Sequence, residues 1–152
     1  MIAKENVILR SACACDIEKI LELEKKAFPF DAWTKELFEA YLCNSDSSSV
    51  IFIVAENNKK LIGYVCLHII LDEAEIENLA VDCNFKRSGI ASMLLEYIIT
   101  KVQNLDVKHM YLEVHIDNIP AIELYKKFGF EALRTRKNYY PYGDAFELKR
   151  TL

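Results

Sequence analysis

The stretch best suited to chemistry reads Leu79-Ala-Val-Asp-Cys-Asn-Phe-Lys-Arg-Ser-Gly-Ile-Ala91. An apolar, strand-like segment leads into a polar loop, and Gly89 opens a long segment with helical periodicity. The first N–H groups of a helix lack partners within the helix, and its dipole adds positive potential, so a pyrophosphate fits there. Gly89 lets the backbone approach such a group or adopt a positive φ angle. The alternative is a plain strand-to-helix turn with a basic rim of Lys86 and Arg87.

Two carboxylates precede this stretch at positions 75 and 77. Glu75 and Glu77 share one face of an expected strand, because side chains alternate along a strand. They are candidates for accepting a proton, and a solvent-facing pair of charges is the alternative. Cys83 lies near the polar loop, but covalent catalysis needs a basic partner that the sequence does not supply.

The elements that position these residues follow from apolar periodicity and capping signals. Asp16, Thr34 and Asn118 are the expected N-caps, and Gly129 is an expected C-cap. Strands are expected over residues 7–10, 50–55, 61–70, 74–81, 110–114, 130–135 and 145–149, with helices over 17–27, 35–42, 89–102 and 119–128. The polar run Asn44–Ser49 is expected to be a loop.

The order of these elements predicts an α+β fold. Short polar turns at 57–60 and 71–73 predict a three-stranded antiparallel meander. The strand, long helix and strand between residues 74 and 114 predict a parallel crossover. We therefore expect one domain over residues 1–152, with a mixed α/β sheet and helices on both faces.

Composition narrows the class of protein. A net charge of −4 argues against nucleic acid as the main partner, although a local basic patch remains compatible with a phosphate-rich cofactor. The five cysteines include no C-x-x-C pair, so we expect free thiols in a reducing compartment and no metal site. No apolar run of membrane-spanning length and no signal-peptide pattern over residues 1–10 appear, which predicts a cytoplasmic protein with no membrane partner. The oligomeric state is not specified.

The loop also carries a resemblance to a known family. Lys86-Arg-Ser-Gly89-Ile-Ala91 resembles the acetyl-CoA signature of the GNAT superfamily, which reads Gln or Arg, two residues, Gly, one residue, then Gly or Ala. Lys86 departs from the usual first residue; it keeps the charge but loses the planar geometry. The resemblance implies the acyl-CoA N-acyltransferase fold, with a mostly antiparallel, twisted central sheet.

Further motifs, in the same order, narrow the resemblance over nearly the whole chain. They are similar to the ribosomal-protein-alanine N-acetyltransferases and to the catalytic subunits of protein N-terminal acetyltransferases. These motifs are Ala27-Phe-Pro-Phe30, Leu71-Asp-Glu-Ala74, Asn78-Leu-Ala-Val81, Tyr111-Leu-Glu-Val114, Ala121-Ile-Glu-Leu-Tyr-Lys-Lys-Phe-Gly-Phe130 and Asn138-Tyr-Tyr-Pro141.

The resemblance implies roles for individual residues. The family's general base matches Glu113, and its general acid matches Tyr125. Other GNAT branches place their base close to Glu75, where the ribosomal-protein branch carries no acid, so Glu75 ranks second as the base. The acetyl-CoA contacts match Leu79, Ala80, Val81, Lys86, Arg87, Ser88, Gly89, Ile90, Ala91, Ser92 and Asn118.

The implied acceptor is a protein N-terminus, possibly that of a ribosomal protein. Tyr139 and Tyr140 match hairpin tyrosines that bind the substrate backbone, and Phe28 and Pro29 match the opposite wall, with core packing an equal alternative for Phe28. An α-amine has a pKa of about 7.7–8.0 against about 10.4 for lysine, so it needs a weaker base. A small-molecule amine, a lysine side chain and a non-catalytic acetyl-CoA-binding module are the alternatives.

Overall fold

The computed structural model describes residues 4–44 and 47–152. Positions 45–46 of the expected loop, and the first three residues of the N-terminal stretch, lie outside the described residues. The helices are α1 (Ile17–Ala27), α2 (Lys35–Cys43), α3 (Ile90–Gln103) and α4 (Ile119–Lys127). The strands are β1 (Val7–Ser11), β2 (Val50–Asn57), β3 (Lys60–Ile70), β4 (Glu73–Val81), β5 (His109–His115), β6 (Glu131–Tyr140) and β7 (Gly143–Thr151).

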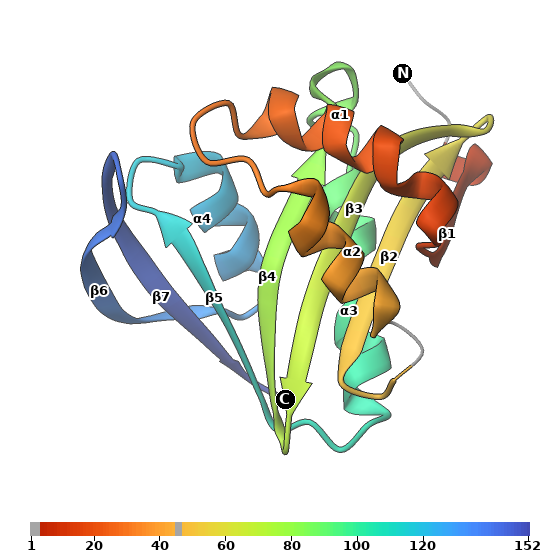
Figure 1. Ribbon diagram of the computed structural model, residues 1–152. Coiled ribbons are helices and arrows are strands. Elements are labelled where there is room, and N and C mark those ends of the chain that lie inside the picture. The colour runs from red at the N-terminus through yellow and green to blue at the C-terminus, as the bar shows by residue number, and fades with distance from the viewer. Residues whose placement is uncertain (1–3, 45–46) are drawn as a thin grey trace.

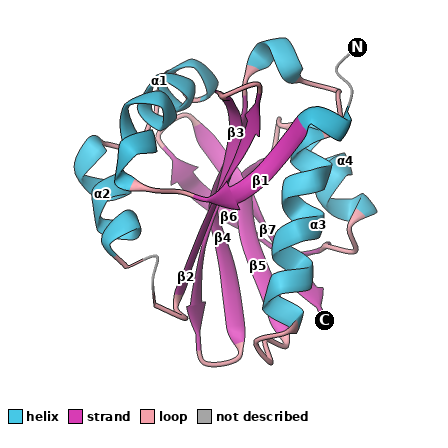
Figure 2. Ribbon diagram, turned by 90° about the vertical axis from the view of Figure 1, so that its right-hand side faces the viewer, coloured by secondary structure: helices cyan, strands magenta, loops and turns pink. Residues whose placement is uncertain are grey.

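The seven strands form one sheet in the order β1-β2-β3-β4-β5-β7-β6. The β4–β5 pair is parallel and every other neighbouring pair is antiparallel. Helices α1 and α2 cover one face, and α3 and α4 cover the other (Figures 1 and 2). The mixed sheet, the antiparallel meander and the parallel crossover are thus confirmed.

Each face of the sheet buries its own apolar core. Under α1 and α2, the rings of Phe38 and Tyr64 meet edge to face with centroids 5.7 Å apart, beside Phe52. Under α3 and α4, Leu94 and Leu112 belong to a larger aliphatic cluster. Alternation along the strands divides the apolar residues between the two cores. Among the described helices, none has the length and apolarity to cross a membrane.

Most of the expected helix ends are confirmed. The Thr34 hydroxyl accepts from the N–H of Leu37 at 3.3 Å at the start of α2. The Asn118 side chain accepts from the N–H of Ala121 at 3.4 Å at the start of α4. Gly129 ends α4 with a φ angle of +83°, which favours glycine.

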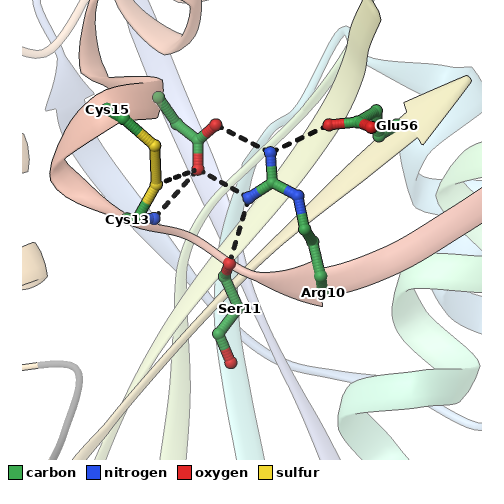
Figure 3. Close-up of polar contacts among 6 residues, drawn as sticks. Arg10, Ser11, Cys13, Cys15 and Glu56 are labelled. Carbon is green, nitrogen blue, oxygen red and sulfur yellow. Dashed lines mark hydrogen bonds and ion pairs between the residues drawn. A yellow bond between two sulfur atoms is a disulfide. The ribbon is translucent and has the colours of Figure 1, made fainter. Parts of the chain in front are cut away.

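Asp16 occupies the expected N-cap position of α1, but its side chain makes no capping hydrogen bond to that helix. Instead, both of its carboxylate oxygens accept from Arg10 at 2.8 Å, and the same guanidinium donates to Glu56 at 2.9 Å (Figure 3). Through this bidentate ion pair Asp16 joins the start of α1 to β1, and Arg10 joins both to β2.

The expectation of five free thiols is wrong. Cys13 and Cys15 form a disulfide (Figure 3), while Cys43, Cys66 and Cys83 are free. The short 3-10 turn Ala14–Asp16 brings the two Cα atoms to 5.3 Å, within the range that a disulfide spans. The count and spacing of the cysteines gave no indication of this pairing, because it depends on the local turn.

Candidate active site

The candidate site is centred on the place where the adjacent strands β4 and β5 diverge. Their parallel pairing covers 73–76 of β4 and 109–112 of β5, although β4 continues to Val81 and β5 to His115. Beyond Ile76 and Leu112 the two strands diverge (Figure 1). One backbone edge of each strand is therefore left without a neighbouring strand in the middle of the sheet, where unpaired N–H and C=O groups can bind a ligand.

The three residues expected to contact the cofactor from β4 lie on this free edge. Leu79, Ala80 and Val81 pair with β3 on their other side, opposite Val65, Tyr64 and Gly63. Ala80 packs toward α1, whereas Leu79 and Val81 pack against the core under α3 and α4. The side chains of Leu79, Ala80 and Val81 thus pack in the two cores, and their backbone groups face the opening.

The loop from β4 to α3 has the geometry of an anion site. Gly89 stands at the N-cap of α3 with a φ angle of 85° and offers no side-chain cap, so the first-turn N–H groups remain open. Arg87 also adopts a positive φ angle of 60°. The Ser88 hydroxyl donates to the Phe85 carbonyl and holds the loop in shape.

The other expected loop contacts differ in exposure. Lys86 and Arg87 are exposed, Ala91 and Ser92 are half-buried, and Ile90 is buried in the core, so Ile90 offers only its backbone. At the far side of the opening, Asn118 uses its side-chain oxygen to cap α4.

A cavity of about 360 Å³ adjoins the loop, between α1, the β2–β3 turn and the start of the β4–α3 loop. Its lining includes the lysines Lys19, Lys26, Lys59, Lys60 and Lys86, and two acids, Glu22 and Asp82. The excess of lysines provides a local positive potential on a chain whose net charge is −4.

Three carboxylates gather on the α1–α2 face of the opening, which we call the acceptor face. Glu113 projects there from β5, since Leu112 and Val114 on either side pack into the opposite core. Glu75 lies close enough to Glu113 for the two carboxyl groups to share a hydrogen bond. Glu77 joins them from β4, within range of the charge on Glu113.

A β-bulge in β4 gives the acceptor face its shape. Cys66 of β3 pairs with Asn78 and Leu67 pairs with Ile76, which leaves Glu77 without a partner. The extra residue puts Glu77 and Asn78 on the same face of the sheet. Bulges commonly re-aim side chains next to active sites.

Arg136 of β6 brings a positive charge to Glu113 in this cluster. Its Nη1 donates to Glu113 Oε1 at 2.6 Å, and the Glu113 side chain is only 8% exposed. The Tyr139 ring lies over the guanidinium, 4.8 Å from its centre. A second bulge, between Arg136 and Tyr140, brings Tyr139 back over the site. The expected Glu113 and Tyr139 are thus joined through a residue that the sequence had not indicated.

Burial and like charge both raise carboxyl pKa values here. Burial, then the charges of Glu113 and Glu77, raises the pKa of Glu75 to about 7. Burial also raises the pKa of Glu77, against the effects of His68 and of a hydrogen bond from Tyr41. A carboxyl group with a pKa near 7 exchanges protons readily at neutral pH.

Tyr125 lies on the opposite side of the sheet from the carboxylates. It belongs to the core under α3 and α4, is 8% exposed, and meets Phe130 edge to face at 5.9 Å. Burial raises the pKa of Tyr125 to about 12, which favours the protonated phenol that an acid requires. Its hydroxyl makes no hydrogen bond within the described residues. Glu113 and Tyr125 therefore lie on opposite faces of the sheet.

The loop between α1 and α2 forms one wall of the acceptor face. Phe28 is half-buried and packs against the core under α1, whereas Pro29 is exposed. The fully buried Glu24 holds this loop. It accepts from the Trp33 N–H at 2.8 Å, from the Asn78 side chain at 3.0 Å and from the Tyr64 hydroxyl. Glu24 thus fixes the loop to the bulge of β4.

The β6–β7 hairpin forms the other wall and reaches the first. The Tyr142 hydroxyl donates to Asp31 at 2.9 Å, and its ring lies 6.2 Å from that of Phe30. Tyr140 stacks on Tyr142 with ring centroids 5.4 Å apart. These contacts connect the two walls through side chains that lie about 110 residues apart in the sequence.

His115 supports the hairpin from below. Its ring stacks on Tyr142 with centroids 4.9 Å apart. Its Nδ1 accepts from the Asp117 N–H at 3.1 Å, while its buried Nε2 has no partner among the described residues. A Cβ atom at Gly143 would lie 2.5 Å from this Nε2, so glycine is needed there for space.

Several residues of the site were missed by sequence reasoning. These are Glu24, Arg136, Tyr142 and His115, whereas Asn78 stood in one of the motifs that carry the resemblance, without a role of its own. A signal existed only for Glu24, an acidic residue at helical spacing among the apolar residues of α1. The others depend on pairings between distant segments.

Comparison with known proteins identifies the class. Residues 17–130 match the model of the acetyltransferase (GNAT) family. The chain belongs to the GNAT acetyltransferase family, whose members are acetyl-CoA-dependent N-acyltransferases.

Individual relatives show which acetyltransferases this chain resembles. The chain is 32% identical over 132 residues to the [ribosomal protein bS18]-alanine N-acetyltransferase of Escherichia coli K12, covering 87% of this chain and 86% of that one. The Ard1 structure from Thermoplasma volcanium is 26% identical, with a TM-score of 0.88 over 97% of this chain and 98% of that one. A GNAT acetyltransferase from Elizabethkingia anophelis, solved with acetyl-CoA bound, is 26% identical, with a TM-score of 0.77 over 98% and 100% of the two chains.

Proposed function

We propose that this acetyltransferase modifies the α-amine of a protein N-terminus, and that a ribosomal protein with an N-terminal alanine is the natural acceptor. The observation that carries the proposal is the parting of β4 from β5, with carboxylates on one face and Tyr125 on the other. The name of the E. coli relative supports the acceptor.

The residues around the opening fit acetyl-CoA. The free edge of β4 at Leu79–Val81 suits an extended, amide-containing arm, which can hydrogen-bond like a neighbouring strand. The open start of α3 at Gly89 and the nearby lysines suit its phosphates. When bound, acetyl-CoA supplies the activated thioester.

The acceptor amine must lose a proton as its nitrogen attacks the thioester carbon. Glu113 or Glu75 takes this proton on the acceptor face. A backbone N–H on the free edge of β4 stabilises the charge that develops on the carbonyl oxygen. As the C–N bond forms and the C–S bond breaks, Tyr125 gives its proton to the departing sulfur, and solvent reprotonates the phenolate.

The walls of the acceptor face suit a peptide end. Tyr139 and Tyr140 from the hairpin, with Phe28 and Pro29 from the α1–α2 loop, border the carboxylates. The three carboxylates favour a second candidate, a small cationic amine, since an acidic site attracts positive charge.

Mass spectrometry of a mixed N-terminal peptide library, incubated with the protein and acetyl-CoA, tests the proposal. We expect acetylation confined to α-amines, with a preferred first residue. A parallel incubation with polyamines and lysine-containing, N-terminally blocked peptides tests the alternatives. Activity on those acceptors alone would contradict the N-terminal assignment.

A further inference from the structure

The disulfide between Cys13 and Cys15 lies outside the candidate active site. It stands at the turn between β1 and α1 (Figure 3), and strands β2 and β3 lie between β1 and β4 in the sheet. Both cysteines are exposed, although Asp16 directly after them is buried. A small reagent in solution can therefore reach the two sulfur atoms, which is the first requirement for thiol chemistry.

The turn that carries the two cysteines is held by bonds that do not involve sulfur. The Asp16 carboxylate accepts from the Cys13 N–H at 2.9 Å, and the Asp16 N–H donates to the Cys13 carbonyl at 2.9 Å. Asp16 is only 2% exposed and is fixed in turn by the bidentate pair with Arg10. Arg10 is itself bonded to Glu56 of β2. The turn should therefore keep its shape when the disulfide is reduced.

Reduction would then leave two thiols already held together. The Cα atoms are 5.3 Å apart, within the range that a disulfide spans. The Asp16 carboxylate also lies 3.3 Å from the Cys13 sulfur, where it can accept the S–H of a reduced Cys13. In an unfolded chain the same two residues sample many arrangements. Folding thus brings the thiols together before they react, which raises their effective concentration toward each other.

We propose that Cys13 and Cys15 form a reversible thiol–disulfide exchange site, which takes small-molecule disulfides as oxidants and small thiols as reductants. One cysteine thiolate attacks a sulfur of the small disulfide, so that a mixed disulfide forms and one small thiolate leaves. The second cysteine thiolate attacks the protein sulfur of the mixed disulfide, which closes the bond between the cysteines and releases the second small thiolate.

The exchange balances without any further reactant. The two cysteine thiols are oxidised to one disulfide, while one small disulfide is reduced to two small thiols. The two protons that the cysteines lose are taken up by the two released thiolates. An excess of small thiol drives the same steps in reverse and restores the dithiol.

The other cysteines of the chain serve as internal controls. Cys43 and Cys83 are exposed and free, so each should stop at a mixed disulfide with the small molecule. Cys66 is fully buried, and burial raises the pKa of its thiol well above the ordinary value. Cys66 should therefore stay unreacted in the folded protein, because the thiolate is the form that reacts.

The test equilibrates the fully reduced protein in buffers that contain reduced and oxidised glutathione at varied ratios. Free thiols are then trapped with N-ethylmaleimide, and mass spectrometry reads the tryptic peptide over residues 11–19, which holds Cys13 and Cys15 and no other cysteine. We expect this peptide to pass from two labels to none as the oxidised form increases, with the glutathione adduct as a minor species.

The same titration of the wild type in urea, at a concentration that unfolds the chain, measures the exchange without the turn. At one glutathione ratio, the ratio of internal disulfide to dithiol should be about tenfold higher in the folded protein. Asp16→Asn loses the bidentate pair with Arg10 and should fall between these two values. Glu18→Gln is the matched control, since Glu18 is an exposed acid of the same segment, and it should behave as the wild type.

Circular dichroism verifies that both variants fold. Equal ratios in the folded and the unfolded chain would overturn the inference. So would a folded protein whose peptide keeps both labels at every glutathione ratio, or one that stops at the glutathione adduct. An Asp16→Asn ratio identical to that of the wild type would overturn the role of Asp16 in holding the turn. These results do not depend on acetyl transfer, because the disulfide itself is measured.

Discussion

The two sides of the site are built in different ways. The proposed cofactor side comes almost entirely from one contiguous segment, the end of β4, its loop and the start of α3. The acceptor face combines side chains from α1, α2, β3, β4, β5 and the β6–β7 hairpin. The proposed cofactor side offers mainly backbone N–H groups, and the acceptor face offers charged and aromatic side chains.

This difference has consequences for mutation. A backbone site tolerates side-chain changes as long as its φ angles are kept, and it is lost when they are not. The acceptor face depends on a balance of charges between distant segments, so one substitution there alters the neighbours' proton affinities as well. Substitutions on each side should therefore separate cofactor binding from chemistry and from acceptor binding.

The largest effect on catalysis is expected from Tyr125→Phe, a change in the core under α3 and α4. Because a phenylalanine cannot protonate the departing sulfur, kcat should fall by about 100-fold or more, while the acetyl-CoA Kd changes by less than about threefold. Steady-state kinetics and calorimetry measure the two quantities. Tyr97→Phe, a half-buried tyrosine of α3, is the control. A kcat within a factor of two of the wild type would refute the acid role.

The largest effect on stability is expected from Glu24→Ala, which removes the link between the α1–α2 wall and the β4 bulge. Three donors lose their buried acceptor, at about 1–3 kcal/mol for each group left unsatisfied, so the free energy of unfolding should fall by about 3 kcal/mol or more. Urea titration measures this change.

Its control is Glu22→Ala, whose exposed carboxylate pairs with Lys26 on the surface of α1. Such pairs contribute little to stability. Equal loss in the two variants would show that Glu24 has no special structural role.

A smaller effect is expected from Gly89→Ala on the cofactor side. Alanine disfavours the left-handed conformation by about 1–2 kcal/mol, so a loop that relaxes without ligand must be forced back on binding. The acetyl-CoA Kd should rise about 5- to 30-fold, as measured by calorimetry. Gly129→Ala, at a φ angle of +83° after α4, carries a similar strain away from the loop and should leave the Kd unchanged.

The smallest effect is expected from Tyr142→Phe, which removes the hydrogen bond to Asp31 between the two walls. Since this bond is exposed, the KM for the acceptor should rise only about threefold, with kcat and the acetyl-CoA Kd retained. Tyr111→Phe, which loses an exposed bond to Glu73 instead, should leave the acceptor KM unchanged. An altered acetyl-CoA Kd in Tyr142→Phe would show that the walls do not act on the acceptor alone.

The sequence by itself determined the elements and much of the cofactor side. Gly129 was predicted as a C-cap, Thr34 and Asn118 as N-caps, and Gly89 as a place where the backbone approaches a phosphate or adopts a positive φ angle. These signals are local: a cap or a left-handed residue satisfies groups within a few residues of itself. Apolar periodicity likewise depends only on the repeat of a helix or strand.

Only the tertiary structure decided the acceptor face. The contacts of Arg136 with Glu113 and of Tyr142 with Asp31, and the turn that brings Cys13 to Cys15, left no pattern in the sequence. The bulge at Glu77 is fixed by its register against β3. Burial and neighbouring charge set the acidity of Glu75, and both arise only when β4, β5 and β6 are packed together. The residue types indicated which groups can exchange a proton, whereas the packing determined which of them is free to do so.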